Sequence, residues 1–135
     1  MALIRWTDSL SVQVAQLDQQ HQILINLINE LNDAMRQGKG QQVMDPILDR
    51  LVAYAGSHFA TEERYFIQYA YPAAGEHRRA HAEFADRVAD FKERLMQTRI
   101  GLSIEVMNFL SDWLQHHIQG EDKKYSACFN AAGLK

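Results

Sequence analysis

Four stretches of the chain repeat apolar residues at steps of three and four, the spacing that lines up side chains on one face of an α-helix. The first of these stripes runs from Leu17 to Met35. The other three run over residues 47–65, 77–95 and 107–117. Because each stripe must be buried against another element, the sequence predicts long helices that pack on one another.

Turn-forming residues separate the stripes. Residues 37–40, 69–75 and 98–101 each contain glycine, and the second of them also contains proline. Glycine and proline interrupt helices, so these segments are predicted to be the connections. Ser103 suits the N-cap of the fourth helix, and Gly120 marks its predicted end.

Short connections favour antiparallel neighbours, so the predicted fold is all-α, an up-down-up-down four-helix bundle. Residues 17–119 would form the bundle, 1–16 an N-terminal arm and 120–135 a short C-terminal tail. Trp6 in the arm is expected to pack against the bundle. A length of 135 residues fits a single domain over the whole chain.

Composition excludes several classes of function. The 14 basic and 17 acidic residues give a net charge of −3 without a basic block, which argues against nucleic acid as a partner. No run approaches the roughly 20 apolar residues of a membrane-spanning helix, so no membrane insertion is expected. Cys128 is the only cysteine, which excludes an internal disulfide and a thiolate zinc cluster. The cytoplasm is the expected compartment.

Histidine is the informative residue type. Five of the six histidines fall on core positions of the stripes: His21, His58, His77, His81 and His117. A single buried histidine is commonly satisfied by a hydrogen bond. Five of them need more partners than helix interiors supply, and a metal ion can provide them.

The predicted topology brings these histidines together. The C-terminal part of one helix lies beside the N-terminal part of the next in an antiparallel bundle. His21 is early in its helix and His58 late, the pair in the third helix is early, and His117 is late. All five are therefore expected at the same end of the bundle.

Two carboxylates extend the set. Glu62 lies one helical turn beyond His58 on the same stripe. Asp122 is five residues beyond His117, which rotates it by ~140° on a regular α-helix. It can point inward only if the helix ends or loosens near Gly120; otherwise it is a solvated charge beside two lysines.

Five neutral nitrogens and two carboxylates are too many ligands for one tetrahedral zinc. They suit two metal ions that share bridging carboxylates. Imidazole and carboxylate together fit iron, manganese, zinc or copper, and the spacing does not choose among these metals.

Four segments carry a resemblance to a known family. They are Leu17-Asp-Gln-Gln-His21, His58-Phe-Ala-Thr-Glu-Glu63, Tyr71-Pro72 with the two histidines that follow it, and residues 113–125. In type, order and spacing they resemble the signature of hemerythrins, most closely the single-domain bacteriohemerythrins. The likeness covers the whole chain. One departure is Gln13, where the family often has glycine.

The resemblance implies a cofactor of two non-haem iron ions (Fe²⁺/Fe³⁺) with an oxo or hydroxo bridge. Three histidines would hold one iron, two would hold the other, and two carboxylates would bridge both; in that order the residues are His77, His81, His117, His21, His58, Glu62 and Asp122. The iron with two histidines is left one ligand short, and dioxygen would bind there.

The implied function is reversible dioxygen binding for storage, delivery or sensing, which is not an enzyme activity. The alternatives are a di-iron oxidoreductase acting on peroxide, nitric oxide or dioxygen, and an iron-holding protein. Di-iron carboxylate bundles use Glu-x-x-His motifs, and none occupies a core stripe here. Neutral imidazoles should instead favour the ferrous pair and release of intact dioxygen. The resemblance does not say whether an oxygen-consuming enzyme is a partner.

Several neighbours of the proposed ligands have candidate roles of their own. His116 and Glu63 lie off the stripes and are expected at the surface, with Glu63 alternatively an acceptor for a ligand. Tyr54 and Tyr125 are candidate hydroxyl donors to the ligands. Four apolar residues could line a dioxygen pocket or simply pack in the core: Leu24, Trp113, Leu114 and Ile118.

Overall fold

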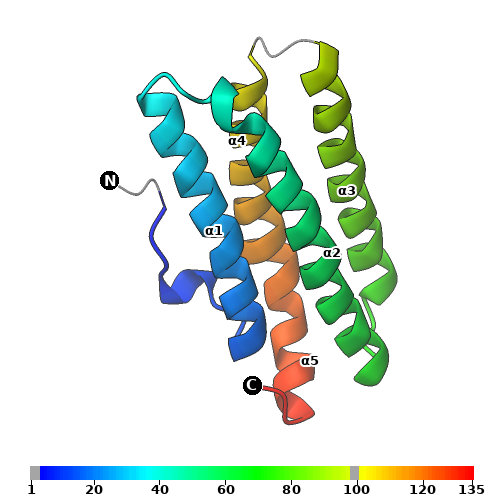
Figure 1. Cartoon of the computed structure of the whole chain (residues 1–135). Coiled ribbons are helices and arrows are strands. Elements are labelled where there is room, and N and C mark those ends of the chain that lie inside the picture. Colours follow the sequence, from blue (N-terminus) through cyan, green and yellow to red (C-terminus); the bar gives the residue numbers. More distant parts are fainter. Residues whose placement is uncertain (1–3, 98–100) are drawn as a thin grey trace.

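Four long antiparallel helices make up the protein, as the stripes predicted (Figure 1). The computed structural model describes residues 4–97 and 101–135, and this part of the chain contains helices, turns and loops but no strands. The long helices are α1 (Ala15–Arg36), α2 (Met44–Gln68), α3 (Ala74–Gln97) and α4 (Leu102–Trp113). The short 3₁₀ helices η1 (Asp8–Leu10) and η2 (Gln41–Val43) lie in the arm and in the first connection.

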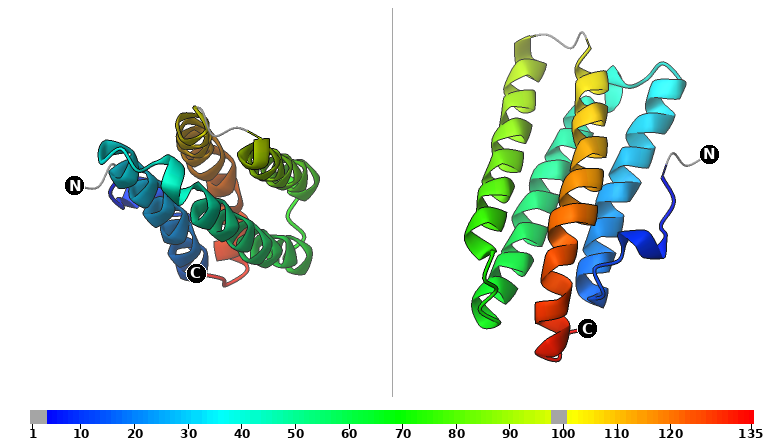
Figure 2. Two further views of the ribbon diagram at one scale, coloured as in Figure 1. Left: turned by 45° about the horizontal axis from the view of Figure 1, so that its top comes forward. Right: turned by 180° about the vertical axis from the view of Figure 1, so that it is seen from behind.

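The fourth helix does not end at Gly120, so that prediction is wrong. α4 continues as a π-helix, η3 (Leu114–Glu121), then as the 3₁₀ helix η4 (Asp122–Tyr125) and the α-helix α5 (Ser126–Ala131). Figure 2 shows this continuous column in its right-hand view. The C-terminal residues are therefore helical and belong to the packed body.

The start of α4 also differs from the prediction. Gly101, with φ of 72°, is the residue before the helix, and Ser103 lies inside its first turn. Glycine adopts this left-handed conformation without steric cost, whereas serine does not. The N-cap role expected of Ser103 is therefore taken by Gly101.

The N-terminal arm is fixed along α1. The backbone N–H of Ile4 donates to Asn29 Oδ1 at 2.9 Å, and Asn29 Nδ2 donates back to the Ile4 carbonyl at 2.9 Å. Asp18, in the first turn of α1, accepts from the Val12 N–H at 2.8 Å. Trp6 packs against the core, as expected from the sequence. These contacts make the arm part of the folded body.

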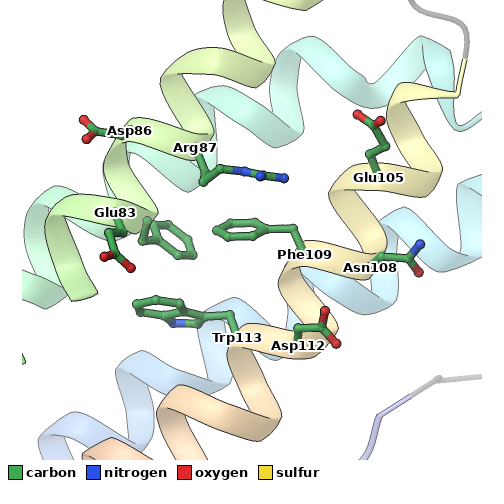
Figure 3. Close-up of a pocket in the computed structure, with 9 residues that line it drawn as sticks. Glu83, Asp86, Arg87, Glu105, Asn108, Phe109, Asp112 and Trp113 are labelled. Atoms are coloured by element: carbon green, nitrogen blue, oxygen red, sulfur yellow. The ribbon is translucent and has the colours of Figure 1, made fainter. Parts of the chain in front are cut away.

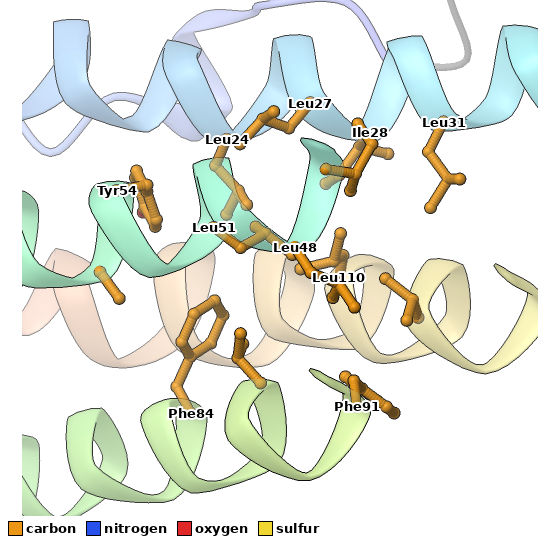
Figure 4. Close-up of a cluster of buried hydrophobic side chains, with 14 of the residues drawn as sticks. Leu24, Leu27, Ile28, Leu31, Leu48, Leu51, Tyr54, Phe84, Phe91 and Leu110 are labelled. Atoms are coloured by element: carbon orange, nitrogen blue, oxygen red, sulfur yellow. The ribbon is translucent and has the colours of Figure 1, made fainter. Parts of the chain in front are cut away.

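Two groups of buried apolar side chains fill the bundle. The larger, here called the main core, includes residues of all four long helices, and Figure 4 shows part of it. The smaller, here called the end cluster, lies where α1 begins and α2 ends; it consists of Val12, Val14, Leu17, Phe66, Tyr71, Tyr125 and Phe129. Tyr125 and Phe129, from the C-terminal helices, are fully buried. They close this end of the bundle.

Among the described residues, none of the helices combines the length and the apolar character that crossing a bilayer requires.

Candidate metal centre

All seven residues predicted as ligands lie together between the main core and the end cluster. The helices α1, α2 and α3 contribute five of them, the π-helix η3 contributes His117, and η4 contributes Asp122. None of the seven is more than 4% exposed; they are His21, His58, Glu62, His77, His81, His117 and Asp122. On α1 and α2 they lie one or two turns from a residue of the end cluster, for example His21 after Leu17. The predicted convergence at one end of the bundle is therefore seen in the structure.

The π-helix explains how Asp122 turns inward. The backbone N–H of Asp122 donates to the carbonyl of His117, a bond from residue i+5 to residue i. This wider turn places residues five apart on the same face, whereas a regular α-helix would separate them by ~140°. Asp122 is fully buried. The loosening that its inward orientation required is thus a π-helical segment rather than a helix end.

One oxygen of Asp122 and one oxygen of Glu62 lie close to ring nitrogens of three histidines, His77, His81 and His117. Asp122 Oδ1 lies 2.6 Å from His77 Nε2 and 3.0 Å from His117 Nε2. Glu62 Oε1 lies 2.9 Å from His81 Nε2. The potential ligand atoms of these three histidines and two carboxylates all lie within 4.8 Å of one another. We refer to the five residues as the three-histidine group.

The other oxygen of each carboxylate faces the remaining two histidines. Asp122 Oδ2 lies 3.0 Å from His21 Nε2, and Glu62 Oε2 lies 3.4 Å from His58 Nε2. These four residues, here called the two-histidine group, also place their ligand atoms within 4.8 Å of one another. Glu62 and Asp122 therefore belong to both groups, each with a separate oxygen toward each.

Buried polar atoms without hydrogen-bond partners converge at this place. Buried nitrogens and oxygens in proteins are almost always hydrogen-bonded, because an unpaired one costs free energy. Seven of the buried atoms that lack a hydrogen bond within the described residues belong to this site. They are His21 Nε2, His77 Nε2, His81 Nε2, His117 Nε2, Glu62 Oε1, Asp122 Oδ1 and Asp122 Oδ2. Metal cations would pair with all of them, so the residues fit a metal site.

The carboxylates and imidazoles shift one another's pKa. Burial alone would raise the pKa of Glu62, but the positive charge of His58 and the close nitrogens of His21 and His81 hold it well below its ordinary value. Burial alone would lower the pKa of His21, but the Asp122 and Glu62 carboxylates outweigh it and raise the value to about 9. Without metal, the proton on His21 thus helps to balance the buried carboxylates. A metal ion would replace that proton.

Two histidines are oriented by polar neighbours. His58 Nδ1 donates to Gln20 Oε1 at 2.6 Å, and His81 Nδ1 donates to Glu63 Oε2 at 3.0 Å. Such bonds fix the tautomer, so that Nε2 keeps its lone pair for the site. Glu63 is thus an acceptor for a ligand, one of its two expected readings. Gln20 was missed by the sequence reasoning, since it precedes His21 and lies off the apolar stripe.

Tyr125 holds one of the carboxylates. Its hydroxyl donates to Glu62 Oε2 at 2.5 Å. This is the role that the sequence suggested for Tyr125. The hydroxyl of Tyr54, suggested for a similar role, has no hydrogen-bond partner within the described residues. That suggestion does not hold for Tyr54 in this structure.

Aromatic rings pack against the histidine rings. Trp113 stacks on His117 with ring centroids 3.8 Å apart, and Phe59 stacks on His81 at 3.9 Å. Trp113 also lines a cleft of about 750 Å³ between α3 and α4, seen in Figure 3 with Arg87 beside Phe109. Trp113 therefore lies between this cleft and a histidine of the three-histidine group. Phe59 was not singled out from the sequence.

The other neighbours occupy ordinary positions. His116 is exposed, and its Nδ1 lies 3.1 Å from the Asp112 carbonyl on the helix surface, as expected. Leu24, Leu114 and Ile118 are buried in the main core.

Comparison with known proteins agrees with this site. The family model for the hemerythrin HHE cation binding domain matches residues 12–128. The chain belongs to the hemerythrin family.

Individual relatives cover nearly the whole chain. A bacteriohemerythrin of Stenotrophomonas maltophilia is 36% identical over 126 residues, which span 93% of this chain and 81% of the relative. A myohemerythrin of Theromyzon tessulatum is 27% identical over 121 residues, spanning 90% of this chain and 89% of the relative. The crystal structure of a wild-type hemerythrin superposes with a TM-score of 0.83 at 27% identity, covering 94% of this chain and 98% of that one.

Proposed function

We propose that the protein binds dioxygen reversibly at a di-iron centre, for storage, delivery or sensing of oxygen. One observation carries the proposal: Glu62 and Asp122 each direct one oxygen to the three-histidine group and the other to the two-histidine group. A carboxylate in that position can bridge two metal ions. Membership of the hemerythrin family favours iron over the other metals that the ligand types allow.

The residues would take the following roles. His77, His81 and His117 would hold one iron, and His21 and His58 would hold the other. Glu62 and Asp122 would serve both irons. A bound ferrous pair would supply the electrons for reversible dioxygen binding. The two-histidine group has one member fewer than the other, so an iron held there would have a position left for an external ligand.

The surrounding residues serve this function by excluding water and orienting ligands. The main core lies on one side of the site and the end cluster on the other. Gln20 and Glu63 orient imidazoles, and Tyr125 donates to Glu62. Such partners of ligands commonly change metal affinity by about 10- to 100-fold.

The ligand composition favours binding of dioxygen over its cleavage. Five imidazoles are neutral when they hold metal, and the two carboxylates are the only anionic side chains in the two ligand groups. Di-iron carboxylate proteins instead use a Glu from each of two helices and a Glu-x-x-His from each of the others. Less anionic donation stabilises the ferrous pair, which supports a binding protein rather than an oxidase.

Anaerobic loading with Fe(II) followed by exposure to air tests the function. We expect a visible absorption band that appears with air, disappears when oxygen is removed, and returns on re-exposure. Rapid irreversible oxidation, or turnover with an added reductant, would instead support an enzyme. Azide binding by the same iron-loaded sample shows separately whether an open metal position exists.

A further inference from the structure

Tyr54 carries a buried hydroxyl without a hydrogen-bond partner within the described residues. Its side chain is only 5% exposed. Leaving such a group unpaired costs free energy, so it normally has a partner in the working protein. The hydroxyl of Tyr125, on the other side of the site, already donates to Glu62. Within the described residues, the Tyr125 hydroxyl therefore has a hydrogen-bond partner and the Tyr54 hydroxyl does not.

The position of Tyr54 directs its hydroxyl toward the two-histidine group. Tyr54 lies one turn before His58 on α2, and their rings are stacked with centroids 5.1 Å apart and an interplanar angle of 18°. Both side chains leave the same face of α2. The Tyr54 ring therefore lies beside the His58 ring, and its hydroxyl is buried in the interior. Figure 4 shows Tyr54 projecting into the bundle at the end of the main core.

Tyr54 is the donor nearest the two-histidine group in the layer that covers the site from the main core. Three side chains of this layer, each one turn from a proposed ligand, cannot donate a hydrogen bond; they are Leu24, Phe84 and Leu114. Trp113 also has a buried Nε1 without a partner within the described residues, but its ring stacks on His117, in the three-histidine group.

The Tyr54 hydroxyl can act as a donor. A phenol with its ordinary pKa of about 10 carries its proton at neutral pH. A phenol that keeps its proton can donate it in a hydrogen bond. It matches a small ligand with an electronegative acceptor atom.

We propose that the Tyr54 hydroxyl donates a hydrogen bond to the small ligand bound at the open position of the two-histidine metal. The inference rests on the proposed function and names a residue that determines ligand affinity there. The ligand class is a small molecule or anion with an oxygen or nitrogen acceptor, such as dioxygen or azide. Binding would give the unpaired hydroxyl its partner.

The test compares azide binding by ferric, iron-loaded wild type, Tyr54→Phe and Tyr69→Phe. We expect Tyr54→Phe to bind azide roughly tenfold more weakly, with faster dissociation, as loss of a charge-assisted hydrogen bond implies. Tyr69→Phe removes a phenolic hydroxyl that accepts from Gln68 away from the site. It is the matched control and should bind azide as wild type does.

A second measurement separates ligand binding from a structural role. In the metal-free protein, Tyr54→Phe should melt at or above the wild-type temperature, because the lost hydroxyl had no partner. Tyr125→Phe should melt lower, since it removes the donor to Glu62. Weaker azide binding by Tyr54→Phe together with a lower metal-free melting temperature would overturn the inference.

The remaining outcomes are equally decisive. Azide affinity of Tyr54→Phe within twofold of wild type overturns the inference, and so does a wild type that binds no azide, because no open position then exists. A wild type that binds azide but not dioxygen reversibly contradicts the proposed function alone. In that case the azide comparison still decides the role of Tyr54.

Discussion

At the scale of single residues, the proposed metal site depends on the side chains that orient its histidines as much as on the histidines themselves. Gln20 shows this directly. Its Oε1 accepts from His58 Nδ1, while its Nε2 donates to Thr61 Oγ1 at 3.3 Å. The second bond fixes which end of the amide faces the histidine. The imidazole of His58 is therefore held by a side chain that is itself held.

Replacing Gln20 should weaken the metal site without removing a ligand. We expect Gln20→Ala to lower iron affinity about tenfold, the lower end of the usual range for such partners, because His58 loses its orienting acceptor. Competition with an iron chelator measures this. Gln22→Ala, at an exposed position on the same helix, is the matched control. Equal iron affinity in the Gln20 and Gln22 variants would show that the hydrogen bond is dispensable.

At the scale of elements, the turn that ends α2 is built around a strained alanine. Ala70 has φ of 51°, and the Tyr71 N–H donates to the Phe66 carbonyl at 3.0 Å. The Ala70 N–H donates to the Ile67 carbonyl. Together these two hydrogen bonds form a Schellman motif, in which the residue with left-handed conformation is usually glycine. Gln13, where the family often has glycine, has a similar φ of 61°.

Glycine at the alanine position should stabilise the protein. The left-handed conformation costs an L-residue roughly 1–2 kcal/mol, so Ala70→Gly should raise the unfolding free energy by about 1 kcal/mol. Ala53→Gly, at an exposed position inside α2, should lower it by about the same amount. Urea unfolding of both variants checks the opposite signs. A destabilised Ala70→Gly would contradict this account of the turn.

The π-helix is another element whose cause can be tested. A Cβ added to Gly120 would meet no atom within 4 Å, and Gly120 is not among the residues with positive φ. The packing of Asp122, rather than the glycine, should therefore hold the wide turn. We expect Gly120→Ala to bind iron as wild type does and to be up to about 1 kcal/mol more stable. Loss of iron from Gly120→Ala would show that the turn requires glycine.

These elements also show what the sequence could predict. Apolar spacing reflects burial, so it located the four helices and the faces on which the five buried histidines and Glu62 lie. The course of the chain after Gly120 was not predictable in this way, since glycine usually ends a helix and a π-turn has no apolar period of its own. Gln20 and Phe59 escaped notice because their roles depend on how neighbouring helices approach, not on the stripe of their own helix.

At the scale of the whole molecule, the bundle buries seven ionisable groups between two apolar clusters. In the metal-free protein, the protonated His21 stabilises the Asp122 and Glu62 carboxylates beside it. His21 has its pKa raised to about 9, from an ordinary value of 6.5. Its contribution to stability is therefore full below pH 6.5 and is lost as the pH rises through about 9.

The pH dependence of unfolding should consequently differ between metal-free and iron-loaded protein. The metal-free protein should melt at a lower temperature at about pH 9 than at pH 6.5, because His21 loses its proton. The iron-loaded protein should lack this decrease, since metal has already displaced the proton. Scanning calorimetry of both forms measures it. A metal-free melting temperature that is constant or rises over this range would contradict the proton balance described for the site.

The iron content of reconstituted protein tests most directly whether the seven buried residues hold two metal ions. Metal analysis should find about two irons per chain in wild type, one for each ligand group. His77→Ala should bind fewer irons and lose thermal stability in the iron-loaded form, because it removes a ligand and leaves Asp122 Oδ1 without that partner. His116→Ala, at the exposed neighbouring histidine, should retain both irons. Wild type with one iron or none, or His77→Ala with the same iron content as wild type, would contradict the proposed two-metal site.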